Sequence, residues 1–153
     1  QEAITHYGIS PGRLALEITE GVMLHDIEKS LRWLNAVHAM GLRIYLDDFG
    51  TGFSSLSYRK RFPIDTLKID KSFVRDMRPD NNEHTLVGAI IAMGRSLGLQ
   101  IVAEGVELPS HLAALGELGC DYAQGYYFSR PVPAEEFATT ATEIAALLAK
   151  PAV

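Results

Sequence analysis

The sequence predicts an α/β fold in which parallel strands are covered on the outside by helices. Segments typical of strands and of helices alternate about five times along the 153 residues, with no repeat, linker or low-complexity stretch between them. Glycine stops several of the helix-like segments. A closed (β/α)8 barrel needs about 250 residues. The chain therefore supplies about five βα units of such a barrel, or forms a small doubly wound sheet that is complete in itself.

The first half of the chain contains two clear strand-and-helix units. A strand is predicted over 13–18, where Leu, Ala and Ile are frequent. Residues 26–40 predict a helix, because apolar side chains recur there every three or four positions and Gly41 follows as a stop. The next strand is predicted over 43–48. Residues 54–61 predict a short helical turn that ends before a proline.

The second half continues the alternation. In order, we expect a strand over 65–70, a turn over 72–77, a loop over 78–82, a helix over 83–97, a strand over 99–103, a helix over 110–118 and a strand over 121–128. Pro133, followed by Glu135 and Glu136, predicts the start of a last helix, because proline and acids are favoured in a first turn. We expect this helix to continue to about Ala149.

The composition argues against several classes of protein. The 14 basic and 19 acidic residues give a net charge of −5, which argues against binding to a nucleic acid polymer. No stretch approaches about 18 consecutive apolar residues, so we expect no membrane span, and the first residues do not resemble a signal peptide. The lone Cys120 fits a reducing, cytoplasmic compartment, and its neighbours predict a buried, inert thiol.

Polar side chains gather at the carboxyl ends of the predicted strands. Acids occur at four of the five ends, and a lysine and a glutamine fill the set. Parallel strands place these ends on one face, which is where barrel enzymes carry their chemistry, so we expect the residues to form one site. They are Glu17, Glu20, Asp47, Asp48, Lys68, Asp70, Glu104, Glu107 and Gln124.

The adjacent acids Asp47 and Asp48 indicate what such a site holds. Adjacent ionised carboxylates repel each other, and burying them is costly unless a cation pairs with them. An apolar run leading into the pair therefore favours a hard divalent metal, Mg²⁺ or Mn²⁺, over a solvated turn. Strand periodicity places Lys68 and Asp70 on one side. Among acids Lys68 keeps its proton, which makes it an electrostatic group rather than a base.

Five motifs, in order along most of the chain, resemble those of the EAL family, which are bacterial phosphodiesterases that cut cyclic di-GMP to a linear dinucleotide. The most specific are the Asp-Asp-Phe-Gly-Thr-Gly and Ala-Glu-Gly-Val-Glu stretches. The motifs cover residues 16–20, 47–56, 67–70, 103–107 and 124–128. The resemblance implies a TIM-like EAL barrel with a two-metal site that uses Mg²⁺ or Mn²⁺ as cofactor.

The resemblance also implies catalytic roles for individual residues. Glu17, Asp47 and Asp48 would ligate metal, with Asp47 bridging two ions. Glu104 would ligate metal or act as general base on the attacking water. Lys68 would hold that water or the phosphate.

Other residues would support this site from nearby positions. Asp70, Glu107 and Gln124 would assist from neighbouring strand ends. Glu20 would brace the loop over 48–56, which in the family borders the substrate and the dimer interface.

One departure from the family is large. The Glu-Ala-Leu motif and an asparagine-bearing strand, which in the family precede the strand of Glu17, are absent. We therefore expect residues 1–153 to be the C-terminal part of an EAL domain, without about three of its eight strands. An open partial barrel exposes sheet edges and apolar surface, so we expect a homo-oligomer or pairing with the missing N-terminal part of the domain.

A non-catalytic cyclic di-GMP receptor or regulatory module is the alternative. Receptor-type relatives generally lose metal ligands or the loop motif, whereas every such residue in the covered region is present here, which favours an enzyme. The absent strands favour a receptor, because they would carry a glutamate and an asparagine of the metal shell. Activity of this chain on its own is left open.

Overall fold

The computed structural model describes residues 2–50, 61–78 and 81–149 and contains one five-stranded sheet. Its strands are β1 (Ala15–Thr19), β2 (Arg43–Phe49), β3 (Thr66–Ile69), β4 (Gln100–Ala103) and β5 (Tyr122–Ala123). All neighbouring strands pair in parallel, and their spatial order is their chain order. A doubly wound sheet reverses its strand order at a switch point. The unbroken order is therefore that of consecutive units of a (β/α)8 barrel, which decides between the two predicted architectures.

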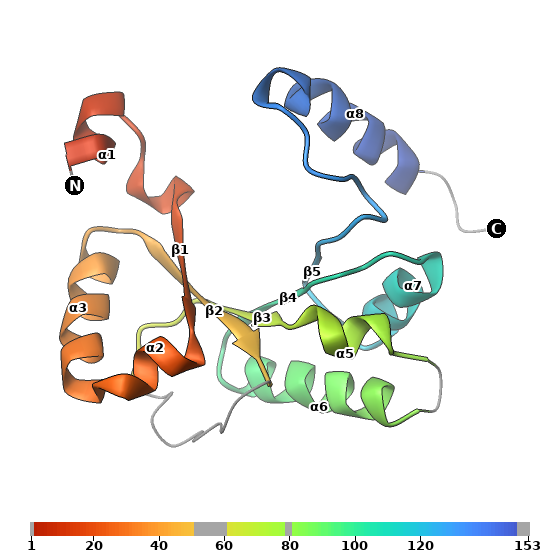
Figure 1. The fold of residues 1–153 in the computed structure, drawn as a ribbon, viewed down its shortest axis with the longest axis horizontal. Coiled ribbons are helices and arrows are strands. Elements are labelled where there is room, and N and C mark those ends of the chain that lie inside the picture. The colour runs from red at the N-terminus through yellow and green to blue at the C-terminus, as the bar shows by residue number, and fades with distance from the viewer. Residues whose placement is uncertain (1, 51–60, 79–80, 150–153) are drawn as a thin grey trace.

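Helices connect and flank the strands (Figure 1). The helices are α1 (Glu2–Tyr7), α2 (Glu20–His25), α3 (Ile27–Ala39), α5 (Lys71–Arg75), α6 (Asn82–Ser96), α7 (Pro109–Glu117) and α8 (Phe137–Leu148), with 3-10 turns η1 (Pro11–Arg13) and η2 (Ala134–Glu136). In Figure 1, α2 and α3 lie beside the β1 end of the sheet, and α8 stands apart from α5, α6 and α7. None of the residues that form α8 is buried.

The predicted elements are largely confirmed. The strands predicted over 13–18, 43–48, 65–70 and 99–103 are present with small shifts of their ends. The helices predicted over 26–40, 83–97 and 110–118 are α3, α6 and α7, and the last helix begins as a 3-10 turn. The turn predicted over 72–77 is the short helix α5, and the structure adds α1, η1 and α2. The turn predicted over 54–61 lies, except for its last residue, outside the described residues.

The prediction of a strand over 121–128 is wrong in its length, because β5 contains only two residues. After Ala123 the chain bends around the peptide of Val106. The Val106 N–H donates to the Gln124 carbonyl at 3.0 Å, and the Tyr127 N–H donates to the Val106 carbonyl at 2.9 Å. The Phe128 N–H closes a turn on the Gly125 carbonyl at 3.1 Å. The backbone groups of this segment thus bind a loop and one another instead of extending the sheet.

Burial alternates along β1, β2 and β4, whereas all four residues of β3 are buried. In β2, Ile44 and Leu46 are fully buried, whereas Tyr45 and Asp47 between and after them are only partly buried. In β1 the buried residue is Ile18, and its neighbours Glu17 and Thr19 are exposed. Each fully buried Leu or Ile side chain stabilises the fold by about 2 kcal/mol. Packing against the helices on one face of the sheet therefore holds the strands in place. The other face and the carboxyl ends of the strands carry polar groups.

Two aspartates each accept a backbone N–H near the amino end of an inner strand, β2 or β4. Asp65 precedes β3, and its Oδ2 accepts the N–H of Ile44 in β2 at 2.8 Å. Asp121 precedes β5, and its Oδ2 accepts the N–H of Ile101 in β4 at 2.9 Å. Both donor residues, Ile44 and Ile101, are fully buried. Each carboxylate thus satisfies a backbone donor that would otherwise be buried without a partner.

We expect Asp65→Ala to lower the free energy of unfolding by about 1–3 kcal/mol, because it leaves the buried Ile44 N–H without an acceptor. Urea denaturation followed by circular dichroism measures the change. The matched control is Asp76→Ala, which removes an exposed carboxylate that pairs with the exposed neighbour Arg75. Equal stability of the two variants would contradict the role given to Asp65.

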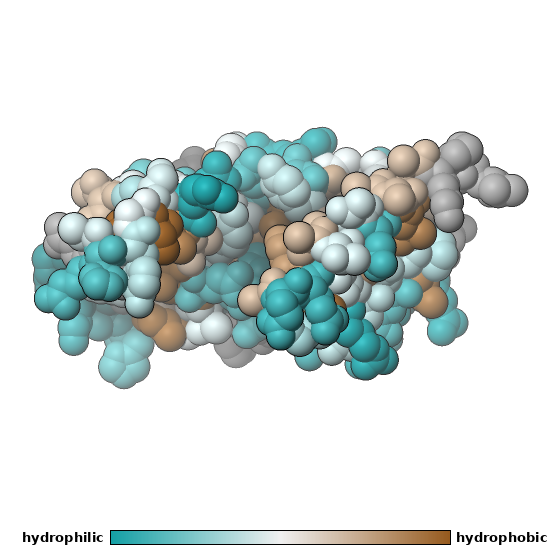
Figure 2. Space-filling model, turned by 90° about the horizontal axis from the view of Figure 1, so that it is seen from above, coloured by the Kyte–Doolittle hydropathy of each residue, from teal (hydrophilic) through white to brown (hydrophobic). Residues whose placement is uncertain are grey.

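Hydrophobic side chains are also exposed, and Figure 2 shows brown patches among hydrophilic surface on the face seen from above. The large exposed apolar side chains include Val22, Trp33, Phe137 and Leu148. In the part of the chain that the structure describes, no helix has the length and apolar character needed to span a membrane.

Candidate active site at the carboxyl ends of the strands

Lys68, in the central strand β3, is the centre of a cluster of carboxylates from three other strand ends. Its Nζ lies 2.6 Å from Glu104 Oε1, 2.9 Å from Glu17 Oε2 and 3.1 Å from Asp47 Oδ1. Only 5% of the Lys68 side chain is exposed, whereas the Glu17 side chain is 49% exposed. The cluster is therefore buried at its cation and open to solvent on the side of β1.

The parallel register brings these four residues together. Thr19 in β1 pairs with Asp47 in β2, and Lys68 in β3 pairs with Val102 in β4. Glu104 follows β4 directly, and its N–H donates to the Ile69 carbonyl at 3.1 Å, which holds it beside the end of β3. The predicted convergence of strand-end residues on one site is thus present for Glu17, Asp47, Lys68 and Glu104.

The cluster keeps Lys68 protonated. Burial by itself lowers the pKa of an ammonium, but the hydrogen bonds to Glu104, Glu17 and Asp47 outweigh it and raise the pKa of Lys68 well above its ordinary value. A raised folded-state pKa means that the stabilisation is complete below the unfolded lysine pKa and is lost only as the pH rises through the higher folded value. At neutral pH Lys68 is therefore a fixed positive charge, as the sequence predicts.

Asp48 sits in an irregular backbone next to Asp47. Its φ is +53°, in the left-handed region that residues with a Cβ rarely adopt. The pairing of β2 with β3 shifts register between Leu46 and Phe49, and the Asp48 N–H donates to Asp47 Oδ1 at 3.0 Å. Backbone strain of this kind concentrates at functional sites. Asp48 is exposed.

The remaining predicted residues surround the cluster. Asp70 lies just beyond β3 and caps α5, where its Oδ1 accepts the Ser72 N–H at 2.9 Å. Burial alone would raise the pKa of Asp70, but the bonds from Ser72 and the charge of Lys71 lower it. Asp70 thus serves as a helix cap instead of continuing the strand with Lys68.

The other three supporting residues have different environments. Gln124 is exposed directly after β5, and its N–H donates to the Ala103 carbonyl at 2.8 Å. Glu107 is exposed on the loop that leads into α7. Glu20 is 6% exposed at the start of α2. The loop that Glu20 is predicted to brace lies, from residue 51 on, outside the described residues.

Arg75 and His111, which the strand-end pattern does not indicate, interact with supporting residues and not with the Lys68 cluster itself. The hydrogen bond with Asp76 and the charges of Glu107 and Asp70 raise the pKa of the exposed Arg75. His111 is 3% exposed, and its Nδ1 lies 3.5 Å from the Glu107 nitrogen. The sequence signal for the contact between His111 and Glu107 is their spacing of four residues across the start of a helix.

The carboxylate oxygens of the cluster are the type of ligand that hard divalent cations prefer, but in this structure they are directed at the Lys68 ammonium. Three carboxylate oxygens from three strand ends already surround one cation, the Lys68 ammonium, at 2.6–3.1 Å. Their arrangement is that of an ammonium site. Within residues 2–50, 61–78 and 81–149, no three His, Cys, Asp or Glu side chains are grouped so as to hold a metal ion by themselves.

Cys120 is remote from this cluster and half-buried. Its Sγ lies 3.2 Å from the Tyr122 carbonyl oxygen, and burial raises its thiol pKa. Because the thiolate is the reactive form, we expect iodoacetamide to modify Cys120 more slowly in the folded protein than in urea at the same pH. Mass spectrometry of timed samples measures both rates. Equal rates would show that the folded thiol is not protected.

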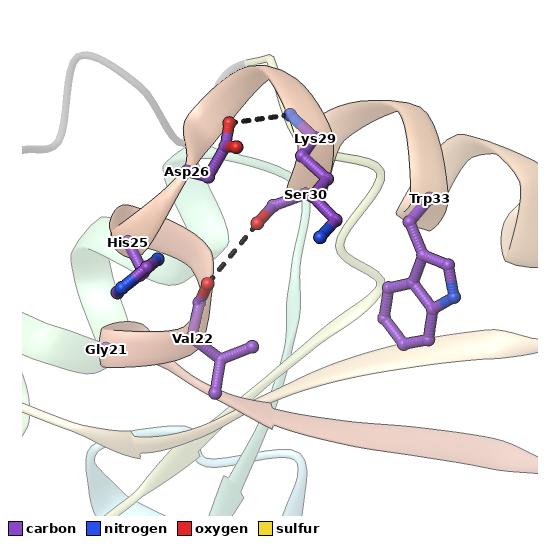
Figure 3. Close-up of a pocket in the computed structure, with 7 residues that line it drawn as sticks. All are labelled: Gly21, Val22, His25, Asp26, Lys29, Ser30 and Trp33. Carbon is purple, nitrogen blue, oxygen red and sulfur yellow. Dashed lines mark hydrogen bonds between the residues drawn. The ribbon is translucent and has the colours of Figure 1, made fainter.

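Cavities also occur outside the cluster in the part of the chain that the structure describes. The first, of about 580 Å³, lies between α2 and α3 (Figure 3) and is lined by Gly21, Val22, His25, Asp26, Lys29, Ser30 and Trp33. Within it the Ser30 hydroxyl donates to the Val22 carbonyl at 3.3 Å, and Asp26 Oδ1 accepts the Lys29 N–H at 3.0 Å. None of the strand-end residues lines it.

The second cavity, of about 770 Å³, lies between β5 and α8. Gln124 lines it together with apolar side chains that include Phe128, Phe137 and Ile144. At its rim the guanidinium carbon of Arg130 lies 4.8 Å from the centroid of the Tyr126 ring.

Sequence comparison shows what the chain is similar to. The profile of the EAL domain matches residues 1–131. The signaling protein YkoW of Bacillus subtilis is 46% identical over 137 residues, which are 90% of this chain and 17% of YkoW. The bifunctional diguanylate cyclase/cyclic di-GMP phosphodiesterase MucR of Pseudomonas aeruginosa is 44% identical over 136 residues, which are 89% of this chain and 20% of MucR.

Solved structures give the same result. The MucR phosphodiesterase in complex with cyclic di-GMP has a TM-score of 0.85 at 44% identity, covering 89% of this chain and 55% of that one. A manganese/cyclic di-GMP complex of BlrP1 from Klebsiella pneumoniae has a TM-score of 0.78 at 32% identity, covering 85% of this chain and 33% of that one. The chain thus spans about a fifth of these curated relatives and about half of the solved MucR chain.

Proposed function

We propose that this chain, which belongs to the EAL domain family, carries part of the active site of a phosphodiesterase that hydrolyses cyclic di-GMP to the linear dinucleotide. The observation that carries the proposal is the convergence of Glu17, Asp47 and Glu104 on the Lys68 ammonium. The similarity to a MucR structure solved with cyclic di-GMP supports the choice of substrate. We propose the cytoplasm as the compartment, since a lone free cysteine suits reducing conditions.

In this proposal Glu17, Asp47, Asp48 and Glu104 would hold Mg²⁺ or Mn²⁺. Bound divalent ions neutralise charge on the non-bridging phosphate oxygens and make water a stronger nucleophile at neutral pH. The BlrP1 complex with manganese and cyclic di-GMP supports the choice of metal. The carboxylate oxygens already directed at a single cation support the choice of ligands.

Lys68 and Glu104 then act on the water and the phosphate. Lys68 stays charged at neutral pH and places its ammonium beside the phosphate oxygens or the attacking water. Glu104, 2.6 Å from that ammonium, is positioned to accept the proton of the water. The water oxygen forms a bond to phosphorus, one ester P–O bond breaks, and the leaving oxygen takes up a proton. Opening the ring in this way gives a linear dinucleotide.

The supporting residues have separate proposed roles. Asp70 fixes the start of α5 beside Lys68, and Glu107 and Gln124 present polar groups from the next two strand ends. Glu20 is buried at the start of α2, and its proposed role is to brace the loop over 48–56, which from residue 51 on lies outside the described residues.

We also propose that further strands complete the sheet into a barrel. β1 and β5 are its edge strands, and each has one side without a partner strand in the described part of the chain. The Thr66 hydroxyl is buried and has no hydrogen-bond partner there. The cavity beside β5 leaves apolar side chains such as Phe137 partly uncovered, and additional chain would bury them. They come from a preceding segment of an EAL domain or from a second copy of the chain.

A non-catalytic cyclic di-GMP receptor is the second candidate. The observation in its favour is that the described carboxylates are arranged around an ammonium and not around a metal position. A receptor would bind the dinucleotide and leave it intact.

Chromatography of cyclic di-GMP incubated with protein and Mn²⁺ distinguishes the two functions. We would test the chain alone and a chimera in which about 100 preceding residues, or three βα units, of the MucR phosphodiesterase complete the barrel. Linear dinucleotide from the chimera supports the enzyme. Binding of cyclic di-GMP by the chimera without any product would establish the receptor instead. Size-exclusion chromatography of the chain alone tests pairing, and a well-folded monomer would count against it.

A further inference from the structure

We propose that the Lys68 ammonium is the resident cation of the carboxylate cluster, and that a divalent metal binds only by displacing it from at least one carboxylate. The inference rests on the function proposed above, because it takes Glu17, Asp47 and Glu104 as residues that receive the metal. It adds a second role for Lys68, which is to set the metal affinity of the site.

The Lys68 ammonium uses its full hydrogen-bonding capacity on the cluster. An ammonium carries three N–H donors, and one oxygen each of Glu104, Glu17 and Asp47 lies 2.6, 2.9 and 3.1 Å from Nζ. Since 5% of the side chain is exposed, little water reaches it. The three strand ends therefore direct their oxygens at a position that the protein's own cation fills.

The charge of the cluster both attracts and obstructs a metal ion. Three carboxylates surround one ammonium, so the cluster as a whole remains negative and attracts a divalent cation. The ammonium repels that cation over the few ångströms that separate them. With Lys68 in this position, no three His, Cys, Asp or Glu side chains of the described residues are grouped so as to hold a metal ion. Metal entry then requires at least one carboxylate to turn away from Lys68.

Removing the positive charge is therefore expected to strengthen metal binding. We expect Lys68→Met, which keeps the length of the side chain, to lower the dissociation constant for Mn²⁺ about tenfold. The same variant should be less stable without metal, because its carboxylates lose their counter-charge, and should gain more in Tm on addition of Mn²⁺ than the wild type. Electron paramagnetic resonance of free Mn²⁺ during titration of metal-stripped protein measures the affinity.

The matched control is Lys71→Met. Lys71 is exposed at the start of α5, three residues after Lys68. It removes the same charge from the same region of the chain without touching the cluster, so we expect its Mn²⁺ affinity to equal that of the wild type. A Lys68→Met variant that binds Mn²⁺ no more tightly than Lys71→Met would overturn the inference.

A measurement on the wild-type protein avoids dependence on the folding of the variant. A buried, hydrogen-bonded ammonium gives a protected ¹H–¹⁵N signal, and we expect saturating Mg²⁺ to shift or remove that of Lys68. An unchanged signal at saturating Mg²⁺ would also overturn the inference. If Lys68→Met and Lys71→Met bind Mn²⁺ equally tightly while the wild-type protein cleaves cyclic di-GMP, only the proposed role of Lys68 is refuted. A wild-type protein that neither binds Mn²⁺ nor cleaves the substrate would refute the proposed function as well.

Discussion

Asp47→Asn is expected to lower kcat/KM for cyclic di-GMP hydrolysis by about 1000-fold, or about 4 kcal/mol of transition-state stabilisation. Asp47 comes from β2, between the strands of the other two carboxylates of the cluster, and is a proposed metal ligand that also contacts Lys68. Asparagine keeps its shape but removes the charge, so both the metal ions and Lys68 lose a partner. Initial rates of linear dinucleotide formation in the MucR chimera, with saturating Mn²⁺, measure the change.

The control for Asp47→Asn is Asp76→Asn, which neutralises an exposed carboxylate at the end of α5. Activity of that variant should stay within about twofold of the parent protein, since exposed charges away from a site contribute little. Retention of most activity by Asp47→Asn would contradict the proposed role of Asp47 as a metal ligand.

Gly125→Ala is expected to have the largest effect on stability, a loss of about 3 kcal/mol in the free energy of unfolding. A methyl group at this position would overlap the backbone nitrogen, carbon and oxygen of Val106. Backbone atoms cannot move aside as a flexible side chain can, so the turn after β5 must open. Because Gln124 precedes this turn, the variant should also weaken cyclic di-GMP binding. Thermal and urea denaturation measure the stability.

Gly116→Ala provides the comparison for Gly125→Ala. Gly116 lies in α7, and a methyl group there would meet no neighbouring atom. Alanine favours the helix by about 1 kcal/mol over glycine, so this variant should be as stable as the wild type or more stable. A Gly125→Ala protein as stable as Gly116→Ala would contradict the tight approach to Val106.

The sequence predicts those helices and strands that depend only on a local pattern of apolar and polar residues. The apolar spacing over 26–40 and the glycine after it predict α3, and the structure confirms it with Asp26 as its N-cap. The length of β5 cannot be predicted in this way. It depends on the contact between Gly125 and the peptide of Val106, two residues that are distant in sequence. A strand-like run of side chains does not reveal such a contact.

The sequence likewise predicts only a part of the candidate site. Acids at successive strand ends, in a parallel topology, predict that Glu17, Asp47 and Glu104 share one edge of the sheet. The pattern does not predict that all three contact Lys68, because convergence of side chains depends on the register of four strands. It also places Asp70 in the strand, whereas the side chain of Asp70 caps α5.

Anomalous diffraction from crystals grown with Mn²⁺ and cyclic di-GMP tests most directly whether this carboxylate cluster is the reaction site. Manganese scatters anomalously, so its position is found independently of the refined protein atoms. We expect the anomalous peaks to lie against the carboxylates of Glu17 and Asp47, with the phosphate of the dinucleotide beside Lys68. Bound cyclic di-GMP with no manganese at these carboxylates, or with manganese elsewhere, would contradict a metal-dependent phosphodiesterase site at the carboxyl ends of these strands.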